Sequence, residues 1–184
     1  MKLFDKIIKH SERVGRGAER EVYALSDDYV LKTVRQNRAD LQGNQNKLEL
    51  RVHQECPDHL RYLLCPITAH FYRNQIPIII MERRVCLTDL DKRELRKAKN
   101  RLQSESRRAG EYKEFQLLEV YYKANGLAGY EEFKQDVIQL CEMFTLSVRE
   151  FLNVANNWGV KPDGRIQYID YGGKASRRER QRGR

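Results

Sequence analysis

The sequence predicts an α+β fold in which a strand-rich first half is followed by helices and one late β-hairpin. Two strand-like stretches, near residues 13–25 and 28–35, flank the turn signal Asp27-Asp28 and indicate an antiparallel pair. Further along, residues 112–124 and 130–144 carry apolar side chains at helical spacing. A chain of 184 residues suffices for a single domain of one or two lobes.

The first half continues with a short helix and two more strands. The helix is expected over 47–54, with Leu48, Val52 and also Leu50 as candidates for its apolar side, and the Cys56-Pro57 step ends it. The two strands are expected at 71–72 and 76–81. Because the second of them is apolar throughout, it is predicted to be a central strand.

The second half is predicted as three helices and a hairpin. The helix over 88–108 is dense in charge and has only a thin apolar stripe, so most of it should face water. The helices over 112–124 and 130–144 follow it. The strands 158–160 and 165–169 form the hairpin around a turn that contains proline and glycine.

The composition excludes several classes of protein. No run of 18 apolar residues occurs, which argues against a membrane span, and the N-terminus does not resemble a secretory signal. The four cysteines form no Cys-x-x-Cys pair, and no histidine cluster completes a zinc site. Reduced thiols in a cytoplasmic protein are therefore expected.

A glycine pattern and a lysine suggest a phosphate site. Gly15, Gly17 and Val22 form a G-x-G-x-x-x-x-V pattern on the first predicted hairpin, where a bare backbone can lie close to phosphates. Two glycines by themselves usually indicate a turn and no phosphate site. Fifteen residues after Gly17, however, Lys32 ends a predicted strand, where its ammonium group would pair with phosphates. An ordinary exposed strand lysine is the alternative.

A lysine in this role needs a carboxylate to hold it. Glu49, in the middle of the helix over 47–54, is the first candidate, and Glu55 is the second. The alternative for Glu49 is an ordinary solvated position on the helix.

Two oxygen-bearing side chains bracket the late hairpin. Asn157 and Asp170 are thirteen residues apart, and Mg²⁺ prefers carboxylate and amide oxygens combined with phosphate oxygens. The two ends of one hairpin would supply that geometry. The alternative for Asp170 is a cap on the first turn of the basic tail. Trp158, beside Asn157, is expected to pack in the core rather than to stack on a base.

Together these patterns resemble the protein-kinase-like fold over residues 10–173. Gly15 to Val22 resembles the glycine-rich loop, and Val30-Leu31-Lys32 the lysine strand. Asn157 through Gly172 resembles the catalytic-loop asparagine, the hairpin and the Asp-Phe-Gly turn, here Asp-Tyr-Gly. The sequences Asn157-Trp158-Gly159 and Asp170-Tyr171-Gly172 also resemble those of small kinase-like proteins of bacteriophages.

The resemblance implies a small antiparallel N-lobe over about 10–87, a reduced helical C-lobe over about 88–173, and ATP and Mg²⁺ as cofactors. Lys32 and Asp170 would be the catalytic residues, and Asn157 with Asp170 would hold the metal. The strand that ends at Met81-Glu82 resembles the one entering an adenine-binding hinge. The nucleotide would thus contact Gly15, Gly17, Val22, Lys32, Glu49, Met81 and Glu82.

The sequence also departs from the kinase pattern. Leu152 stands where the catalytic aspartate is expected, and leucine cannot accept a proton. Glu150 is the nearby carboxylate. Arg20 replaces the third glycine of the loop, where it would either block the phosphate site or add a cation. No Ala-Pro-Glu sequence follows Gly173. A weak phosphotransferase and a pseudokinase remain about equally expected.

The last eleven residues, 174–184, carry six basic side chains against one acidic one, and supply five of the nine net positive charges. Such a segment is expected to be disordered and could bind nucleic acid or an acidic protein. The alternative function is therefore a nucleic-acid-associated, virion or host-factor-binding protein that keeps the fold as a scaffold, in the host cytoplasm or the virion. The basic residues are Lys174, Arg177, Arg178, Arg180, Arg182 and Arg184.

Overall fold

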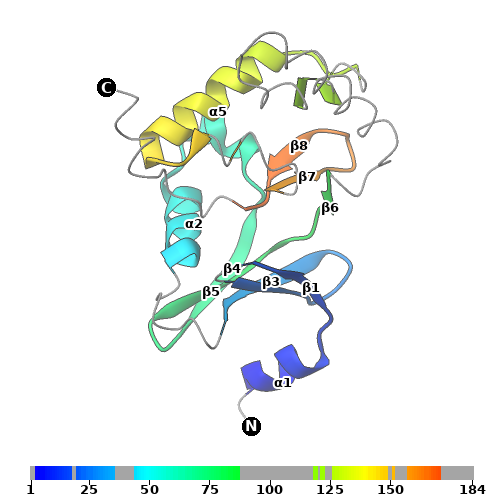
Figure 1. Cartoon of the computed structure of the whole chain (residues 1–184), viewed down its shortest axis with the longest axis vertical. Coiled ribbons are helices and arrows are strands. Elements are labelled where there is room, and N and C mark those ends of the chain that lie inside the picture. Colours follow the sequence, from blue (N-terminus) through cyan, green and yellow to red (C-terminus); the bar gives the residue numbers. More distant parts are fainter. Residues whose placement is uncertain are drawn as a thin grey trace, which may run out of the picture. The chain divides into compact units, whose positions relative to one another are not determined.

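The structure is a computed structural model, and its fold is α+β, with a five-stranded and a three-stranded antiparallel sheet (Figure 1). The chain divides into two units, Met1–Arg84 and Val85–Arg184, and each is described by itself. The structure describes residues 3–17, 20–35, 44–87, 118–119, 121–122, 126–148, 151 and 157–170.

The first unit is built on the five-stranded sheet, in the order β1-β2-β3-β5-β4. All neighbouring strands in it are antiparallel. The strands are β1 (Arg13–Arg16), β2 (Arg20–Ala24), β3 (Tyr29–Val34), β4 (Ile67–Arg73) and β5 (Ile76–Glu82).

The predicted antiparallel pair around Asp27-Asp28 is confirmed, because β2 pairs with β3. Leu25 N–H donates to the Tyr29 carbonyl at 2.9 Å, which closes the turn between β2 and β3 around Asp27-Asp28. The segment 13–25, predicted as one strand, is two strands. Gly17 N–H donates to the Arg20 carbonyl at 2.9 Å, and this turn reverses the chain so that β1 pairs with β2.

The prediction that 76–81 forms a central strand is confirmed. β5 lies between β3 and β4, and consecutive side chains on it are buried because both of its faces are covered. The turn before it places Asn74 and Gln75 at φ values of 49° and 62°. β4, predicted only at 71–72, begins already at Ile67 and lies at one edge of the sheet.

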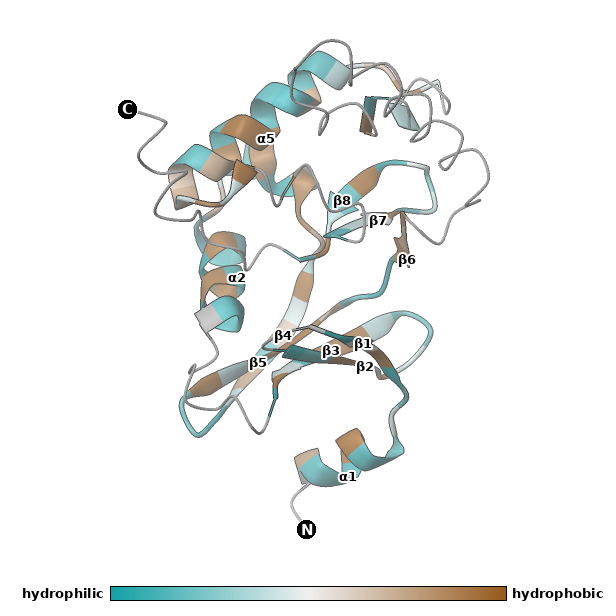
Figure 2. Cartoon of the chain, in the orientation of Figure 1, coloured by the Kyte–Doolittle hydropathy of each residue, from teal (hydrophilic) through white to brown (hydrophobic). Residues whose placement is uncertain are grey.

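Helix α1 (Leu3–His10) was not predicted from the sequence. Its side chains Phe4, Ile7 and Ile8 pack against the buried cluster of Tyr23, Leu31 and Ile78 on the sheet. Figure 2 shows apolar and polar positions mixed along α1, as expected for a short helix that covers a sheet with one face. Phe4, Ile7 and Ile8 stand at helical spacing, so the signal was present in the sequence and was overlooked.

Helix α2 (Asn44–Glu55) contains the predicted helix 47–54 and packs on β5 and β3. It buries Leu48, Leu50 and Val52, as predicted. A 3₁₀ helix, η2 (Asp58–Leu63), follows directly after Pro57.

The second unit contains α5 (Tyr130–Phe144) and the sheet of β6 (Val85–Cys86), β7 (Trp158–Val160) and β8 (Ile166–Tyr168). The predicted late hairpin is confirmed, with Trp158 paired to Tyr168. The apolar residues predicted for the helix over 130–144 are all buried: Phe133, Val137, Leu140, Cys141 and Phe144.

An aromatic cluster forms the core of this unit. Trp158 is fully buried, and its ring centre lies 4.9 Å from that of Tyr168 and 5.4 Å from that of Phe133. Its indole Nε1 donates a hydrogen bond of 2.6 Å to the Phe151 carbonyl. The prediction that Trp158 packs in the core is confirmed.

Several predicted elements lie outside the described residues: the helix over 88–108, most of the helix over 112–124, and the basic tail over 174–184. Residues 118, 119, 121 and 122 are helical, in agreement with the second of these. No helix in the described part of the chain is both long enough and apolar enough to cross a membrane.

Candidate functional site

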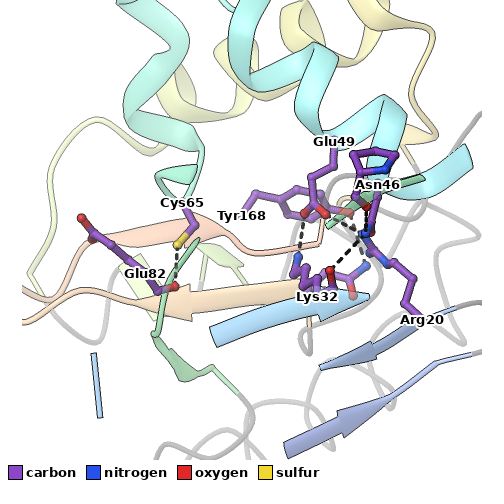
Figure 3. A network of polar contacts seen from close by, with 9 residues as sticks. Arg20, Lys32, Asn46, Glu49, Cys65, Glu82 and Tyr168 are labelled. Carbon is purple, nitrogen blue, oxygen red and sulfur yellow. Dashed lines mark hydrogen bonds and ion pairs between the residues drawn. The ribbon is translucent and has the colours of Figure 1, made fainter. Parts of the chain in front are cut away.

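A buried cluster of charged side chains lies in the first unit, where β2 and β3 meet helix α2. Val22 pairs with Lys32 across the two strands, and Arg20 lies two residues before Val22. Because alternate residues of a strand share a face, Arg20 and Lys32 point to the same side of the sheet. Glu49, on α2, meets both of them there (Figure 3).

The Glu49 carboxylate pairs with two cations in this cluster. Lys32 Nζ lies 2.6 Å from Glu49 Oε1, and Arg20 Nη1 lies 2.5 Å from Glu49 Oε2. The side chains are 6%, 5% and 0% exposed for Lys32, Arg20 and Glu49. Glu49 is therefore held on both of its oxygens, by one cation from each of two neighbouring strands.

Asn46 connects the same helix to the strands beneath it. Its Nδ2 donates to the carbonyls of Lys32 at 3.2 Å and Pro77 at 2.8 Å, and its Oδ1 accepts from Arg20 at 3.3 Å. Asn46 and Glu49 lie three residues apart, so they occupy one face of α2. This buried amide sets the position of α2 over β3 and β5.

The two candidate carboxylates for Lys32 differ in their partners and in their burial. Lys32 contacts Glu49, whereas Glu55 lies exposed at the end of α2 and pairs with Arg51 at 2.9 Å. The alternatives of a solvated Glu49 and an exposed Lys32 do not hold, because both side chains are buried. Buried ion pairs add little net stability, so the pair between Lys32 and Glu49 is weak evidence for a stabilising role.

The fold itself does not require glycine at Gly15 or Gly17. Neither has a left-handed backbone. A Cβ at Gly15 would lie 3.4 Å from the Val22 side chain, and one at Gly17 would lie 3.9 Å from the nearest atom, the Arg20 carbonyl oxygen. Both are ordinary van der Waals contacts, so local packing does not explain these two glycines.

The predicted hinge residues are largely occupied by contacts within the first unit. The Met81 side chain is buried. Glu82 N–H donates to the Pro66 carbonyl at 3.1 Å, its carbonyl accepts from Cys65 Sγ at 3.2 Å, and its carboxylate pairs with Arg84. A contact between adenine and Glu82 would therefore have to share or replace these bonds.

Cys65, beside this segment, is not suited to thiol chemistry. Burial raises the pKa of Cys65 to about 12, so the thiol stays protonated at neutral pH. The described cysteines form no disulfide.

The second unit brings Asn157 and Asp170 to one end of the β7–β8 hairpin. Ile169 N–H donates to the Asn157 carbonyl at 2.7 Å, which extends the pairing of Trp158 with Tyr168 by one step. Asn157 Nδ2 donates to the Tyr168 hydroxyl at 3.3 Å. At the other end, Gly164 has a φ of 82°, the conformation for which the turn needs glycine.

The remaining predicted features either lie outside the described residues or belong to separate units of the chain. Leu152, Glu150 and the Tyr171-Gly172 step lie outside the described residues. Lys32 and Glu49 belong to one unit, and Asn157 and Asp170 to the other. Within the described residues, no group of three or more histidine, cysteine, aspartate or glutamate side chains could hold a metal ion.

Sequence reasoning missed the partners of Arg20 and the whole role of Asn46. Arg20 was noted only as the replacement of a glycine, and Asn46 lies just before the helix predicted over 47–54. The available signal was the spacing of Asn46 and Glu49 by one helical turn, which becomes visible once α2 is known to begin at Asn44.

Comparisons with known proteins identify no family for this chain. No protein-family model and no curated protein sequence matches the chain. Among solved structures, the crystal structure of WbdD is similar with a TM-score of 0.40 and 16% sequence identity, over 89% of this chain and 32% of that one. A likeness of this size assigns neither family nor function.

Proposed function

We propose that the protein is a kinase-like nucleotide-binding protein that takes ATP together with Mg²⁺. The observation that carries this proposal is the buried ion pair of 2.6 Å between Lys32 on β3 and Glu49 on α2. Two opposite charges are removed from water on neighbouring elements, in the order along the chain that the kinase-like resemblance implies.

In this proposal Lys32 pairs with the phosphates of the nucleotide, and Glu49 holds the ammonium group in place. Gly15 and Gly17 let the turn between β1 and β2 approach the phosphates closely. Local packing does not explain either glycine, and a close ligand would do so.

Asn157 and Asp170 are the proposed metal ligands. Their donor atoms, an amide oxygen and a carboxylate oxygen, suit Mg²⁺, which keeps its other positions for water and phosphate oxygens. Support comes from the pairing of Ile169 with Asn157, which brings the two residues to the same end of the hairpin. The metal would neutralise charge on the phosphates.

Phosphate transfer is a separate question from binding. Leu152, at the position of the expected proton acceptor, cannot act as a base. Phosphoryl transfer depends mainly on positioning and charge neutralisation, so a slow reaction is compatible with this departure. We therefore propose binding as the main function and transfer as weak or absent.

Thermal unfolding with and without Mg²⁺ and ATP tests the proposal. A ligand at a hundredfold excess over its Kd stabilises the folded state by about 2.7 kcal/mol. For a chain of this size, this should raise Tm by about 5–10 °C. The rise should disappear in Lys32→Met and in Asp170→Ala, and should persist in the control Arg51→Met, which alters an exposed pair on α2.

The outcomes separate clearly. A Mg²⁺-dependent rise that both variants abolish supports the nucleotide site and justifies a phosphotransfer assay with radiolabelled ATP. If wild type shows no rise at millimolar ATP and Mg²⁺, or if both variants keep the full rise, the proposal is wrong.

A further inference from the structure

Arg20 occupies the place where a third glycine would complete the loop pattern, and its side chain is buried against α2. It is tied to Glu49 at 2.5 Å and to Asn46 at 3.3 Å, and only 4% of the residue is exposed. The sequence left open whether Arg20 blocks the phosphate site or adds a cation. The observed contacts point to a third role, because the guanidinium binds the carboxylate that also binds Lys32.

We propose that Arg20 is a positioning residue for Lys32, acting through the carboxylate of Glu49 that the two cations share. This inference rests on the proposed nucleotide site and names how that site is held together. Arg20 holds Oε2 of Glu49 while Lys32 holds Oε1, so the orientation of the carboxylate depends on both.

Two features favour positioning over simple structural support. First, Arg20 and Lys32 come from adjacent strands and share a face. A shift of either strand would therefore move the Glu49 carboxylate and with it the contact to the other cation. Second, Asn46 bonds both Arg20 and the Lys32 carbonyl, which gives a second connection between the same two residues. A rigid guanidinium fork suits this task better than a flexible ammonium group.

The first test measures nucleotide affinity by titration calorimetry on folded protein with ATP and Mg²⁺. Arg20→Met should weaken binding about tenfold or more, because the lysine that meets the phosphates is no longer held in place. Arg20→Lys should recover part of the loss.

The control is Arg51→Met, the same substitution at an exposed arginine–glutamate pair on α2, which should leave affinity unchanged. If Arg20→Met and Arg20→Lys bind ATP as tightly as wild type or more tightly, the inference is overturned.

A second measurement does not depend on nucleotide. Urea unfolding of Arg20→Met, Lys32→Met and the double variant forms a double-mutant cycle. Each single change leaves Glu49 one of these two cations, whereas the double change removes both. The double variant should therefore lose more stability than the sum of the single losses.

This cycle separates the two proposals. If wild type fails to bind ATP, the proposed function falls, and a double loss greater than the sum of the single losses would still support the shared-carboxylate unit. A double loss equal to or smaller than that sum would overturn the inference, whether or not ATP binds.

Discussion

The two units of the chain bury different kinds of side chain. The first buries charge, with Arg20, Lys32 and Glu49 sharing one cluster between sheet and helix. The second buries aromatic rings around Trp158, whose polar indole nitrogen has a backbone partner. Burial of charge and burial of rings have opposite physical consequences.

Aromatic burial stabilises a fold directly, by removing apolar surface from water and adding ring contacts. Burial of charge carries a desolvation penalty that the ion pairs only partly offset. The comparison therefore suggests that the charged cluster is present for function and the aromatic cluster for stability. In the second unit, the candidate functional residues Asn157 and Asp170 lie at the hairpin end beside the aromatic core.

The largest effect is expected for Glu49→Ala. Removal of the shared carboxylate breaks a buried network, which typically costs about 3–5 kcal/mol. Urea unfolding followed by far-UV circular dichroism measures the loss of stability, and ATP binding should be abolished as well. Glu55→Ala, at an exposed helix pair, is the control and should cost about 0.3–0.5 kcal/mol. Equal losses for the two variants would contradict the distinction between them.

A comparable loss of stability is expected for Trp158→Ala, without the same effect on ATP. Removal of a fully buried tryptophan costs about 3–5 kcal/mol and leaves the Phe151 carbonyl without its indole donor. Tyr72→Ala, at an aromatic residue that is 62% exposed, should change stability by less than about 0.5 kcal/mol. If Trp158→Ala lowers the ATP affinity of the folded fraction more than Glu49→Ala does, the proposed division of roles is wrong.

A smaller effect is expected from pH, through His53 on α2. His53 Nε2 accepts a hydrogen bond of 3.1 Å from Ile67 N–H, which requires the neutral ring. Burial lowers the pKa of His53, Arg61 adds to this, and Glu49 opposes it. The folded state thus binds a proton less readily than the unfolded state, whose pKa is about 6.5.

Stability from His53 is therefore present above about pH 6.5 and is lost as the pH falls through the lower folded pKa. The slope is at most about 1.4 kcal/mol per pH unit. Urea unfolding between pH 7.5 and 5.5 should show a weaker slope in His53→Gln than in wild type, while exposed His59→Gln keeps it. An unchanged slope in His53→Gln would assign the pH dependence to other groups.

The smallest effect on stability is expected from deletion of residues 174–184, which should shift it by less than about 0.5 kcal/mol. Binding to duplex DNA should respond instead. The slope of log K against log salt should fall in magnitude by about 0.9 for each phosphate that the tail neutralises in the full-length protein. If wild type and the deletion variant give the same slope, the tail does not bind the DNA.

Much of the fold could be predicted from the sequence, because periodicity and turn chemistry are local. The central strand β5, the helix α5 with its buried face, and the β7–β8 hairpin all follow from patterns within a few residues. The division of 13–25 into β1 and β2 was missed, because the sequence beside Gly17 contains no proline or aspartate to indicate a turn. Helix α1 was overlooked, although Phe4, Ile7 and Ile8 stand at helical spacing.

The sequence by itself also determined the spacing along the chain of Lys32, Glu49, Asn157 and Asp170. Only the tertiary structure decided which carboxylate meets Lys32 and where Arg20 goes. Spacing limits how far apart two residues can lie, but not which side chains converge on one carboxylate. That choice depends on the pairing of β2 with β3 and on the position of α2, which Asn46 holds through bonds to the Lys32 and Pro77 carbonyls.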